Sequence, residues 1–257
     1  MLGRAIAAVR LNAVHADGER WIKRRRAGMT AVIALGNLFL RLSRSRIQMF
    51  ASCAAWQAWE VAAMRALHGD GAARCESRRA IATRHVPGDS LRARLARGAV
   101  APAMLVEVGR EFARAHALSI GGHAFSHGDP HTGNILYDDA TQQAHLIDVE
   151  TRHEPTLGAR DRHADDLLVL LLDLLGRAPD ATWPVLARAL LAGYRRRDVI
   201  EALEPRLAMP RGLERALWAT RTCFAPRHVL AARLEVLRSV AIDAARPRDV
   251  EPCARGG

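Results

Sequence analysis

The order of apolar and polar positions in the first third of the chain predicts a small region of mixed helix and strand. Residues 11–24 have the pattern of a β-hairpin, in which polar and apolar side chains alternate after an Ala-Asp-Gly turn. Residues 30–50 repeat with helical period, with polar side chains on one stripe and apolar side chains over the remainder. A shorter helix follows at 56–67 and a strand at 79–86. The Pro-Gly-Asp sequence at 87–89 then interrupts the pattern, and we expect a hinge there.

The remaining two thirds of the chain predict a mostly helical region that contains one hairpin. Apolar residues recur at helical spacing over 105–115, whereas 135–137 and 144–147 are short apolar strands joined by a polar turn. Residues 167–175 form a leucine-rich run that is too short to span a bilayer, so it predicts a buried helix. Helical periodicity continues almost to the C-terminus, where we expect 247–257 to be a disordered tail.

Length and composition suit either one compact domain or two small lobes that share a cleft. The chain has 257 residues, of which 49% are apolar and 25% charged, which is typical of a globular protein with a sizeable core. We assign residues 1–87 to a small N-terminal lobe, into which the amphipathic helix at about 30–50 is inserted. Residues 88–246 form the larger helical lobe.

The charge of the chain draws attention to one residue. The formal net charge is +11, almost all positive side chains are arginines, and Lys23 is the only lysine. A single ammonium suits a site that requires a compact charge on a flexible stem and excludes a planar guanidinium. The alternative is that one lysine has survived by chance in an arginine-rich chain.

The four cysteines are scattered, with no CxxC pair and no histidine at metal-ligand spacing. This pattern argues against a disulfide framework and a zinc site, and it favours a reducing compartment. The N-terminus has no visible signal peptide, so we expect a cytoplasmic protein.

Residues 127–138, which read HGDPHTGNILYD, carry the strongest chemical signal. Phosphoryl transfer requires a carboxylate that orients and deprotonates the attacking hydroxyl, oxygen ligands for magnesium, and a cation on the nucleotide phosphates. Asp129 supplies the carboxylate, and Asn134, at the mouth of the hairpin, supplies an amide oxygen. Asp148, at the end of the returning strand, supplies an anionic oxygen of the kind that magnesium prefers. Each residue alone is explained equally well as a turn or surface residue, but the ordered set predicts a phosphotransfer centre.

This segment resembles the catalytic and metal-binding loops of the protein-kinase-like superfamily, H-[RG]-D-x-x-x-x-N followed by D-F-G or D-x-[DE]. The resemblance implies that Asp129 is the catalytic base and that Asn134 and Asp148 bind Mg²⁺. It also implies that Lys23 holds the α- and β-phosphates of ATP, with Glu60 as its ion-pair partner. The implied fold class is α+β, with a small β-containing N-lobe and a mostly helical C-lobe, and the implied cofactors are ATP and Mg²⁺.

The H-G-D form, with glycine before the asparagine, is similar to the small-molecule branch of that superfamily: aminoglycoside and choline phosphotransferases and the heptose and Kdo kinases of the lipopolysaccharide core. The resemblance extends over about 11–175 and is specific over 126–150. It implies a kinase that transfers the γ-phosphate of ATP to a hydroxyl of a sugar or similar small acceptor, with lipopolysaccharide core sugar as the first candidate. The alternatives are an enzyme like the Ser/Thr protein kinases and a catalytically weak pseudokinase scaffold.

The chain departs from the family pattern in three places. No G-x-G-x-x-G loop precedes Lys23, which favours the pseudokinase alternative. Gly128 stands where protein kinases have arginine, so we expect no control by a phosphorylated activation loop. The sequence D-V-E at 148–150 replaces D-F-G. For Glu150 two interpretations fit equally well, an additional acid near the metal and a surface charge. For His131 the two interpretations are a residue that faces substrate and a solvated loop residue.

Two further residues are expected to support the loop. His127 fits a structural hydrogen-bonding role beneath the loop better than that of a base. Asp165 or Asp166, at the start of the buried helix, is expected to cap backbone donors of the catalytic loop or of its own helix.

Arginines bracket the predicted helix at 30–50, at positions 24–26, 41, 44 and 46. Such a segment fits peripheral contact with an anionic inner membrane, and the alternative is that it packs on the helical lobe. A phosphate-rich acceptor such as a glycolipid suits the same charge. We expect no nucleic acid partner, because aromatic residues are few and are not interleaved with the arginines. The sequence predicts no oligomeric state.

Overall fold

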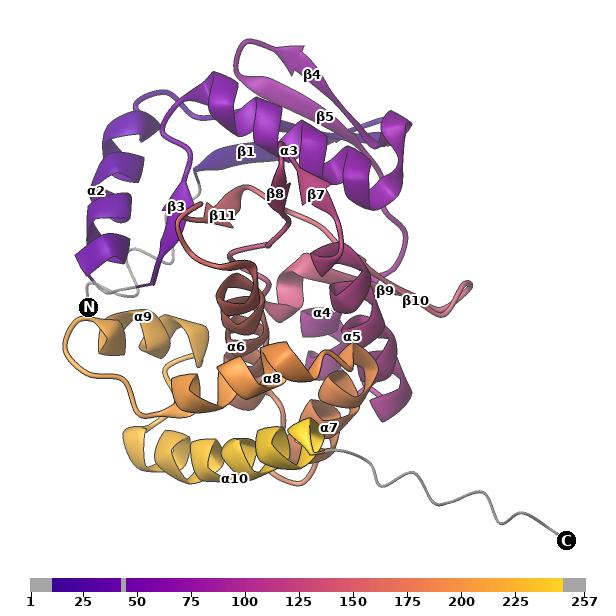
Figure 1. Cartoon of the computed structure of the whole chain (residues 1–257). Helices are drawn as coiled ribbons and strands as arrows, with labels where there is room; N and C mark the ends of the chain where they lie inside the picture. The colour runs from indigo at the N-terminus through magenta and orange to yellow at the C-terminus, as the bar shows by residue number, and fades with distance from the viewer. Residues whose placement is uncertain (1–10, 43–44, 247–257) are drawn as a thin grey trace, which may run out of the picture.

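The protein has two parts that differ in secondary structure, as a computed structural model describes for residues 11–42 and 45–246 (Figure 1). Strands and two long helices make up the N-terminal part, and helices dominate the remainder. The predicted tail at 247–257 lies outside the described residues.

A four-stranded antiparallel sheet forms the N-terminal part. Its strands are β1 (Asn12–Asp17), β2 (Arg20–Arg25), β4 (Ala73–Ser77) and β5 (Ala80–Arg84), in the order β1-β2-β5-β4. The predicted hairpin is therefore confirmed, and Gly18 supplies the positive φ of +56° that its tight turn requires. Alternation along β2 places Ile22 on one face, where it packs with Ala80 and Ala82. Lys23 consequently projects from the opposite face.

Helix α3 (Cys53–His68) covers that opposite face and contains the predicted helix at 56–67. The Ser52 hydroxyl caps its first turn by accepting a hydrogen bond from the backbone N–H of Ala55. The helix ends at Gly69, whose φ of +90° is outside the range of ordinary L-residues. The short 3₁₀ helix η1 (Asp70–Ala72) leads from it into β4.

The helix predicted over about 30–50 is shorter than expected. Helix α2 spans Met29–Leu42, and the residues after it form strand β3 (Ile47–Met49), which pairs with β11 (Thr151–His153). Arg46 takes a left-handed φ of +58°, and the Asn37 side chain bonds to both the N–H and the C=O of Met49. Helical periodicity continues through 47–49, but pairing with a distant strand overrides it.

Short strands connect the two parts. Strands β6 (Asp89–Ser90), β9 (Ile135–Asp138) and β10 (Gln143–Leu146) form a sheet in the order β10-β9-β6, which confirms the predicted second hairpin. A further two-stranded pair consists of β7 (Ser119–Ile120) and β8 (His123–Ala124).

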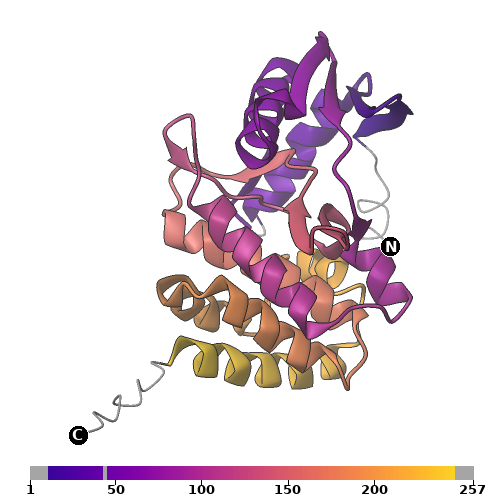
Figure 2. The same ribbon diagram turned by 90° about the vertical axis from the view of Figure 1, so that its right-hand side faces the viewer.

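Helices form the rest of the described chain, and their bounds are α4 (Leu91–Ala96), α5 (Pro102–His116), α6 (Ala159–Arg177), α7 (Trp183–Tyr194), α8 (Arg197–Leu203), α9 (Glu214–Arg221) and α10 (Arg227–Ala245), with 3₁₀ turns η2 (Thr132–Asn134) and η3 (Glu204–Leu207). Figures 1 and 2 both place α10 on the far side of the helical part from the N-terminal sheet.

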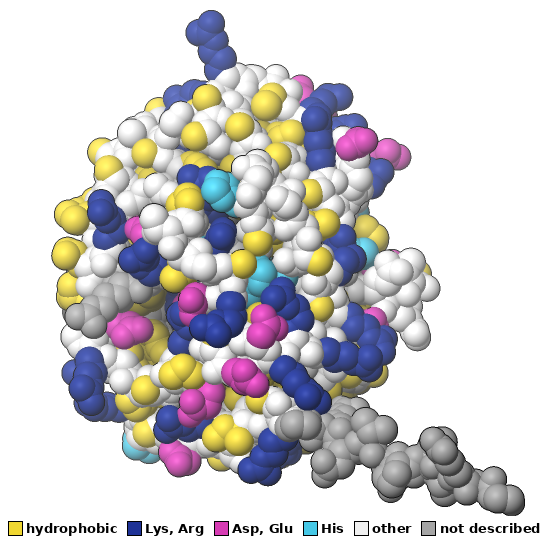
Figure 3. Space-filling model, viewed as in Figure 1, with side chains coloured by type: hydrophobic (Ala, Val, Ile, Leu, Met, Phe, Trp, Pro, Cys, Tyr) yellow, Lys and Arg dark blue, Asp and Glu magenta, His cyan; other side chains and the backbone are white. Residues whose placement is uncertain are grey.

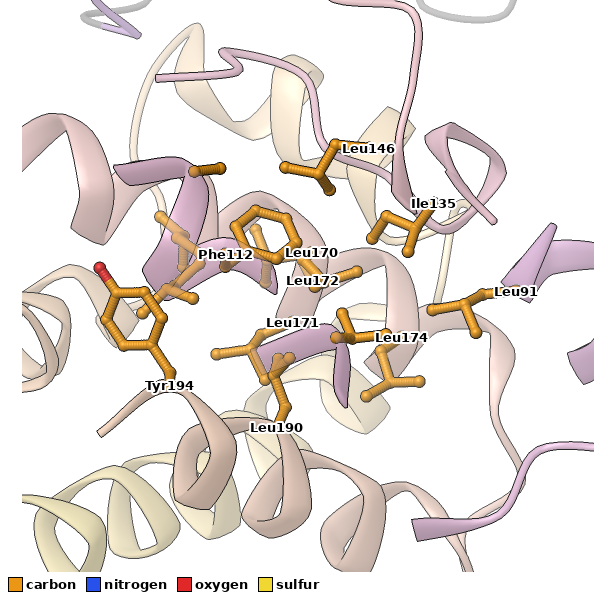
Figure 4. Close-up of a cluster of buried hydrophobic side chains, with 14 of the residues drawn as sticks. Leu91, Phe112, Ile135, Leu146, Leu170, Leu171, Leu172, Leu174, Leu190 and Tyr194 are labelled. Carbon is orange, nitrogen blue, oxygen red and sulfur yellow. The ribbon is translucent and has the colours of Figure 1, made fainter. Parts of the chain in front are cut away.

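Helix α6 is the centre of the core. Its leucines between 167 and 175 are buried, which confirms the predicted buried helix. Figure 4 shows four of them between Phe112 of α5, Tyr194 of α7 and the β9–β10 hairpin. Each fully buried leucine stabilises the fold by about 1.5–3 kcal/mol, so this helix fixes the position of everything attached to it.

The observed architecture confirms the predicted fold class, α+β with a small sheet-containing N-terminal part and a mostly helical C-terminal part. None of the helices in the described ranges has the length and apolar character needed to cross a bilayer.

We predict that Gly109→Ala destabilises the protein by about 1–3 kcal/mol, because α5 and α7 cross too closely for a side chain. A Cβ at Gly109 would lie 2.1 Å from the carbonyl oxygen of Leu190. Gly36→Ala in α2 is the matched control, since a Cβ there meets only the flexible Met49 side-chain end. Urea unfolding should show a loss for the first variant and no loss for the second; equal midpoints would contradict this account of the crossing.

Candidate active site

Lys23 lies in a buried cluster of charged side chains between the sheet and α3. Its ammonium is 2.9 Å from the carboxylate of Glu60, so the predicted partner is in contact with it. Trp56, one turn earlier on α3, donates its indole N–H to the other oxygen of Glu60. Glu60 is therefore fixed in orientation from both sides, and its charge is directed at Lys23.

Two further carboxylates approach the same ammonium from the helical part. Lys23 pairs with Asp148, and its Nζ is 3.1 Å from Oε2 of Glu150. Asn12 of β1 donates to Glu150 and accepts a hydrogen bond of 2.9 Å from Arg25. Glu150, which the sequence left open between two interpretations, is thus a member of this cluster and not an isolated surface charge.

The cluster contains more negative than positive charge, and the pKa values respond to this. Burial alone would lower the pKa of Lys23, but Asp148, Glu150 and Glu60 outweigh it and raise that pKa well above its usual value. Burial raises the pKa of Glu60 to about 7 although Lys23 opposes the shift. Burial also raises the pKa of Glu150, with Asp148 adding to the effect. Burial would raise the pKa of Asp148 too, yet Lys23 holds it below its usual range.

The β9–β10 hairpin brings Asn134 and the Asp148 segment together, as the sequence spacing predicted. The N–H of Ile147 donates to the carbonyl of Asn134 at 3.0 Å, which places Asp148 one residue beyond a paired position. The Asn134 amide nitrogen donates to the carbonyl of Asp129 at 3.0 Å, so its oxygen is the atom left to bind a cation. Asp148 has a φ of +60°, an uncommon conformation for a non-glycine residue and one that concentrates at functional sites.

Asp129 lies on the loop between β8 and η2 and is exposed. In the described part of the chain its carboxylate makes no hydrogen bond or ion pair, and it is available to a solute. The loop itself is ordered by the bond from Asn134 and by the N–H of His131, which donates to the Asp129 carbonyl at 3.0 Å. The His131 ring accepts from the N–H of Gly133 and contacts Arg92, so its two predicted roles remain open.

Two carboxylates of α6 hold the loop from beneath. Asp166 accepts hydrogen bonds of 2.7 Å from the backbone N–H groups of His127 and Gly128, which confirms the loop-capping alternative for this residue. Asp173 accepts from both the N–H and the hydroxyl of Thr132. The two acids are seven residues apart and therefore share one face of the helix. Both ends of the loop are thus attached to the most deeply buried helix in the protein.

Asp166 is itself held by histidine. His116 donates its Nε2–H to Asp166 at 3.2 Å, and its Nδ1 accepts from the hydroxyl of Tyr194 at 2.8 Å. Burial lowers the pKa of His116, which keeps the ring neutral and makes this assignment of donor and acceptor consistent. Burial would raise the pKa of Asp166, but the His116 bond and the nearby His153 lower it well below its usual range.

Gly128 is required by local geometry. Its φ is +82°, and a Cβ there would lie 2.7 Å from the Thr151 hydroxyl, which donates to the carbonyl of His127. Glycine at position 128 is therefore a consequence of how tightly β11 packs against the loop.

Asn12, Arg25 and Asp173 escaped the sequence reasoning. Asn12 and Arg25 complete the cluster around Glu150. Asp165, one of the two predicted capping residues, turns to His153 and not to the loop. Only Asp173 carried a detectable signal, because it is the one charged residue within the leucine-rich run of α6.

The donor set fits a magnesium–nucleotide complex better than a free metal ion. Within residues 11–42 and 45–246, no group of three histidine, cysteine, aspartate or glutamate side chains has the arrangement of a metal site. Magnesium bound with a nucleotide needs only one or two protein ligands, because phosphate oxygens and water complete its coordination. Asn134 and Asp148 would hold the ion, and the surplus negative charge near Asp148 suits a cation.

Two surface hollows adjoin the end of β5. One, of about 410 Å³, lies between the β1–β2 turn and the end of β5, where Trp21 stacks on His85. Trp21 and Lys23 share one face of β2, so this hollow lies along the strand from the charged cluster. The larger one, of about 750 Å³, is lined by α3, α5 and β10. None of the five predicted site residues lines either hollow.

The chain matches no protein-family model, and no curated protein is significantly similar to it in sequence. Solved structures do match: one is described as a choline/ethanolamine kinase family protein from Mesorhizobium loti. It has 11% sequence identity and a TM-score of 0.41, with 93% of this chain and 98% of that chain covered.

We predict that Asp166→Asn destabilises the protein by about 1–3 kcal/mol, because an amide nitrogen cannot accept from the two loop N–H groups and leaves a buried donor unpaired. Asp161→Asn on the same helix is the control, since Asp161 pairs with Arg206 at the partly exposed surface and such pairs contribute about 0–1 kcal/mol. Chemical denaturation should separate the variants. If both lost the same stability, Asp166 would not be anchoring the loop.

Proposed function

We propose that this protein is an ATP- and Mg²⁺-dependent phosphotransferase that moves the γ-phosphate to a hydroxyl of a sugar or similar small acceptor. The observation that carries the proposal is the junction at Lys23, where Glu60 of α3 and Asp148 of the hairpin meet one buried ammonium. Nothing in the packing of two lobes requires such a charged junction, whereas phosphoryl transfer requires a cation beside a magnesium ligand.

Each residue has a distinct part in this proposal. When nucleotide enters, the Lys23 ammonium exchanges its contact with Asp148 for contacts with the α- and β-phosphates. Its ion pair with Glu60 is retained and orients it toward the phosphates. Asn134 and Asp148 hold Mg²⁺, which when bound neutralises charge on the phosphates. Asp129, exposed and without a partner among the described residues, orients the acceptor hydroxyl and takes its proton.

The connection after Asp148 favours a small acceptor over a protein. Residues 149–158 are all that separate Asp148 from α6, and β11 occupies three of them. No long loop is available there to bind an extended peptide, which is the part that the activation segment plays in protein kinases. A glycolipid of the lipopolysaccharide core remains the first candidate acceptor, in keeping with the arginine-rich composition.

A pseudokinase scaffold is the second candidate, and one observation favours it. Lys23 is surrounded by three carboxylates, and no G-x-G-x-x-G pattern precedes it in the sequence, so nucleotide must displace Asp148 from the ammonium without the aid of such a loop. The intact set of Asp129, Asn134 and Asp148 favours the enzyme.

We predict that Asp129→Asn lowers kcat by about 10²–10⁴-fold, the range for removal of a general base. Its stability should not change, because the carboxylate makes no contact in the described chain. Asp70→Asn, another exposed aspartate, is the matched control and should retain full activity. An unchanged rate in Asp129→Asn would remove this residue from the mechanism.

We predict that Lys23→Arg lowers kcat/KM for ATP by roughly 10²-fold, the scale of losing one preorganised electrostatic group. A planar guanidinium keeps the charge but does not fit a buried site shaped around a compact ammonium. The converse exchange at the next residue, Arg24→Lys, changes an exposed side chain and should leave ATP use unaltered. Equal nucleotide affinity and turnover in both variants would exclude Lys23 from the nucleotide site.

The acceptor can be identified by ATP consumption over a panel of sugars, lipopolysaccharide core fragments, aminoglycosides, choline and generic protein, with Asp129→Asn as the blank. Turnover on one small hydroxyl compound supports the enzyme. Nucleotide binding without turnover on any member of the panel supports the scaffold.

A further inference from the structure

Helix α2 directs an apolar face into solvent. Leu35, Leu38 and Leu42 are 69%, 53% and 60% exposed, and Val32 adjoins them at 39%. Their spacing places all four on one stripe of the helix, opposite Ile33, which is its only buried residue. Single exposed apolar side chains need no explanation, whereas a contiguous stripe marks a contact surface.

The stripe is held in that orientation by the rest of the fold. On the opposite side of α2, the Asn37 side chain donates to the carbonyl of Met49 at 2.8 Å and accepts from its N–H at 2.9 Å. Met49 belongs to β3, which pairs with β11. The helix therefore cannot turn its leucines inward without breaking both bonds, and the exposure is a built feature of the protein.

The surroundings of the stripe are positively charged. Residues 20–59 contain eight arginine and lysine residues and no aspartate or glutamate. Arg24, Arg26 and Arg41 are exposed, and their side chains form no ion pair in the described ranges. Arg25, by contrast, turns inward to the carbonyl of Phe50 and is not part of this surface. At the left-hand edge of Figure 3, over α2, apolar side chains project with dark-blue side chains beside them.

We propose that α2 lies on an anionic membrane surface, with its leucine stripe among the upper acyl chains and Arg24, Arg26 and Arg41 against the lipid phosphates. An exposed apolar stripe with basic residues around it, in a segment (20–59) that contains no acid, has the chemistry of an interfacial helix. Each arginine near such a surface contributes about 1 kcal/mol, and the leucines add the hydrophobic part.

Other occupants fit the same observations less well. A second copy that paired α2 with α2 would bring identical arginines together without a carboxylate between them, which is repulsive. Nucleic acid would attract the arginines but leave the leucines in water, and it needs stacking side chains, which the exposed stripe of Val32, Leu35, Leu38 and Leu42 does not contain. A lipid surface satisfies both the apolar and the charged residues, and this inference does not depend on the proposed enzymatic activity.

The experiment measures co-sedimentation of the full chain with two vesicle types, phosphatidylcholine alone and equal parts phosphatidylcholine and phosphatidylglycerol. We expect binding to the mixed vesicles, weakened by salt, and at least about tenfold weaker binding to phosphatidylcholine alone. The double variant Leu35→Gln, Leu38→Gln should bind the mixed vesicles about tenfold or more weakly, since each tenfold loss corresponds to about 1.4 kcal/mol.

Two matched variants make the result decisive. Leu35→Phe with Leu38→Phe keeps the apolar stripe and should retain binding, and Leu213→Gln, which alters a 51% exposed leucine outside α2, should bind like the unaltered chain. Because all these side chains are exposed, the variants should unfold at the same urea concentration as the unaltered protein. The proposal is overturned if anionic vesicles do not bind, if the glutamine pair binds undiminished, or if that pair instead dissociates a dimer.

Discussion

The contact of one buried ammonium with three carboxylates is the constraint on which the relation between the two parts depends. Removing such charges from water costs several kcal/mol per ion, and only close mutual pairing offsets this. Lys23 belongs to β2, Glu60 to α3, and Asp148 and Glu150 to the segment after β10, so segments distant in sequence must meet at one point. The lone lysine therefore aligns the sheet with the helical part and at the same time concentrates charge at the proposed nucleotide site.

The loop that carries Asp129 has little regular hydrogen bonding of its own, and its precision comes from α6. Asp166 and Asp173, two turns apart on one face of that helix, accept N–H groups from the two ends of the loop. The leucines between them anchor the helix in the core. Burial of the leucines thus holds α6 in place. Asp166 and Asp173 in turn hold the loop that carries the exposed carboxylate of Asp129. Asp129 is thus exposed to solvent on a loop whose two ends are bonded to α6.

Local patterns in the sequence were sufficient for the hairpins, the helix that carries Glu60 and the spacing of Asn134 and Asp148, because each depends on residues close together in the chain. They were insufficient where distant segments decide. Residues 47–49 keep a helical period but pair with β11, and Arg25 lies in an apparently solvated arginine cluster but turns into the core. Glu150 could be placed only by knowing that Asn12 and Lys23 converge on it. Contacts between distant segments produce no periodic pattern of apolar and polar residues in the sequence.

The positions where this chain breaks local rules are connected to one another. Asp148 adopts a left-handed backbone conformation, the carboxylates at Lys23 exceed the available positive charge, and α2 exposes leucines that ordinary folding would bury. Sequences that fold well tend to violate such rules only where function offsets the loss of stability. Strand β11 begins directly after Glu150 and pairs with β3, and β3 is bonded to Asn37 of α2. The leucine-bearing helix α2 is thus joined, through two hydrogen-bonded connections, to the segment that holds Asp148.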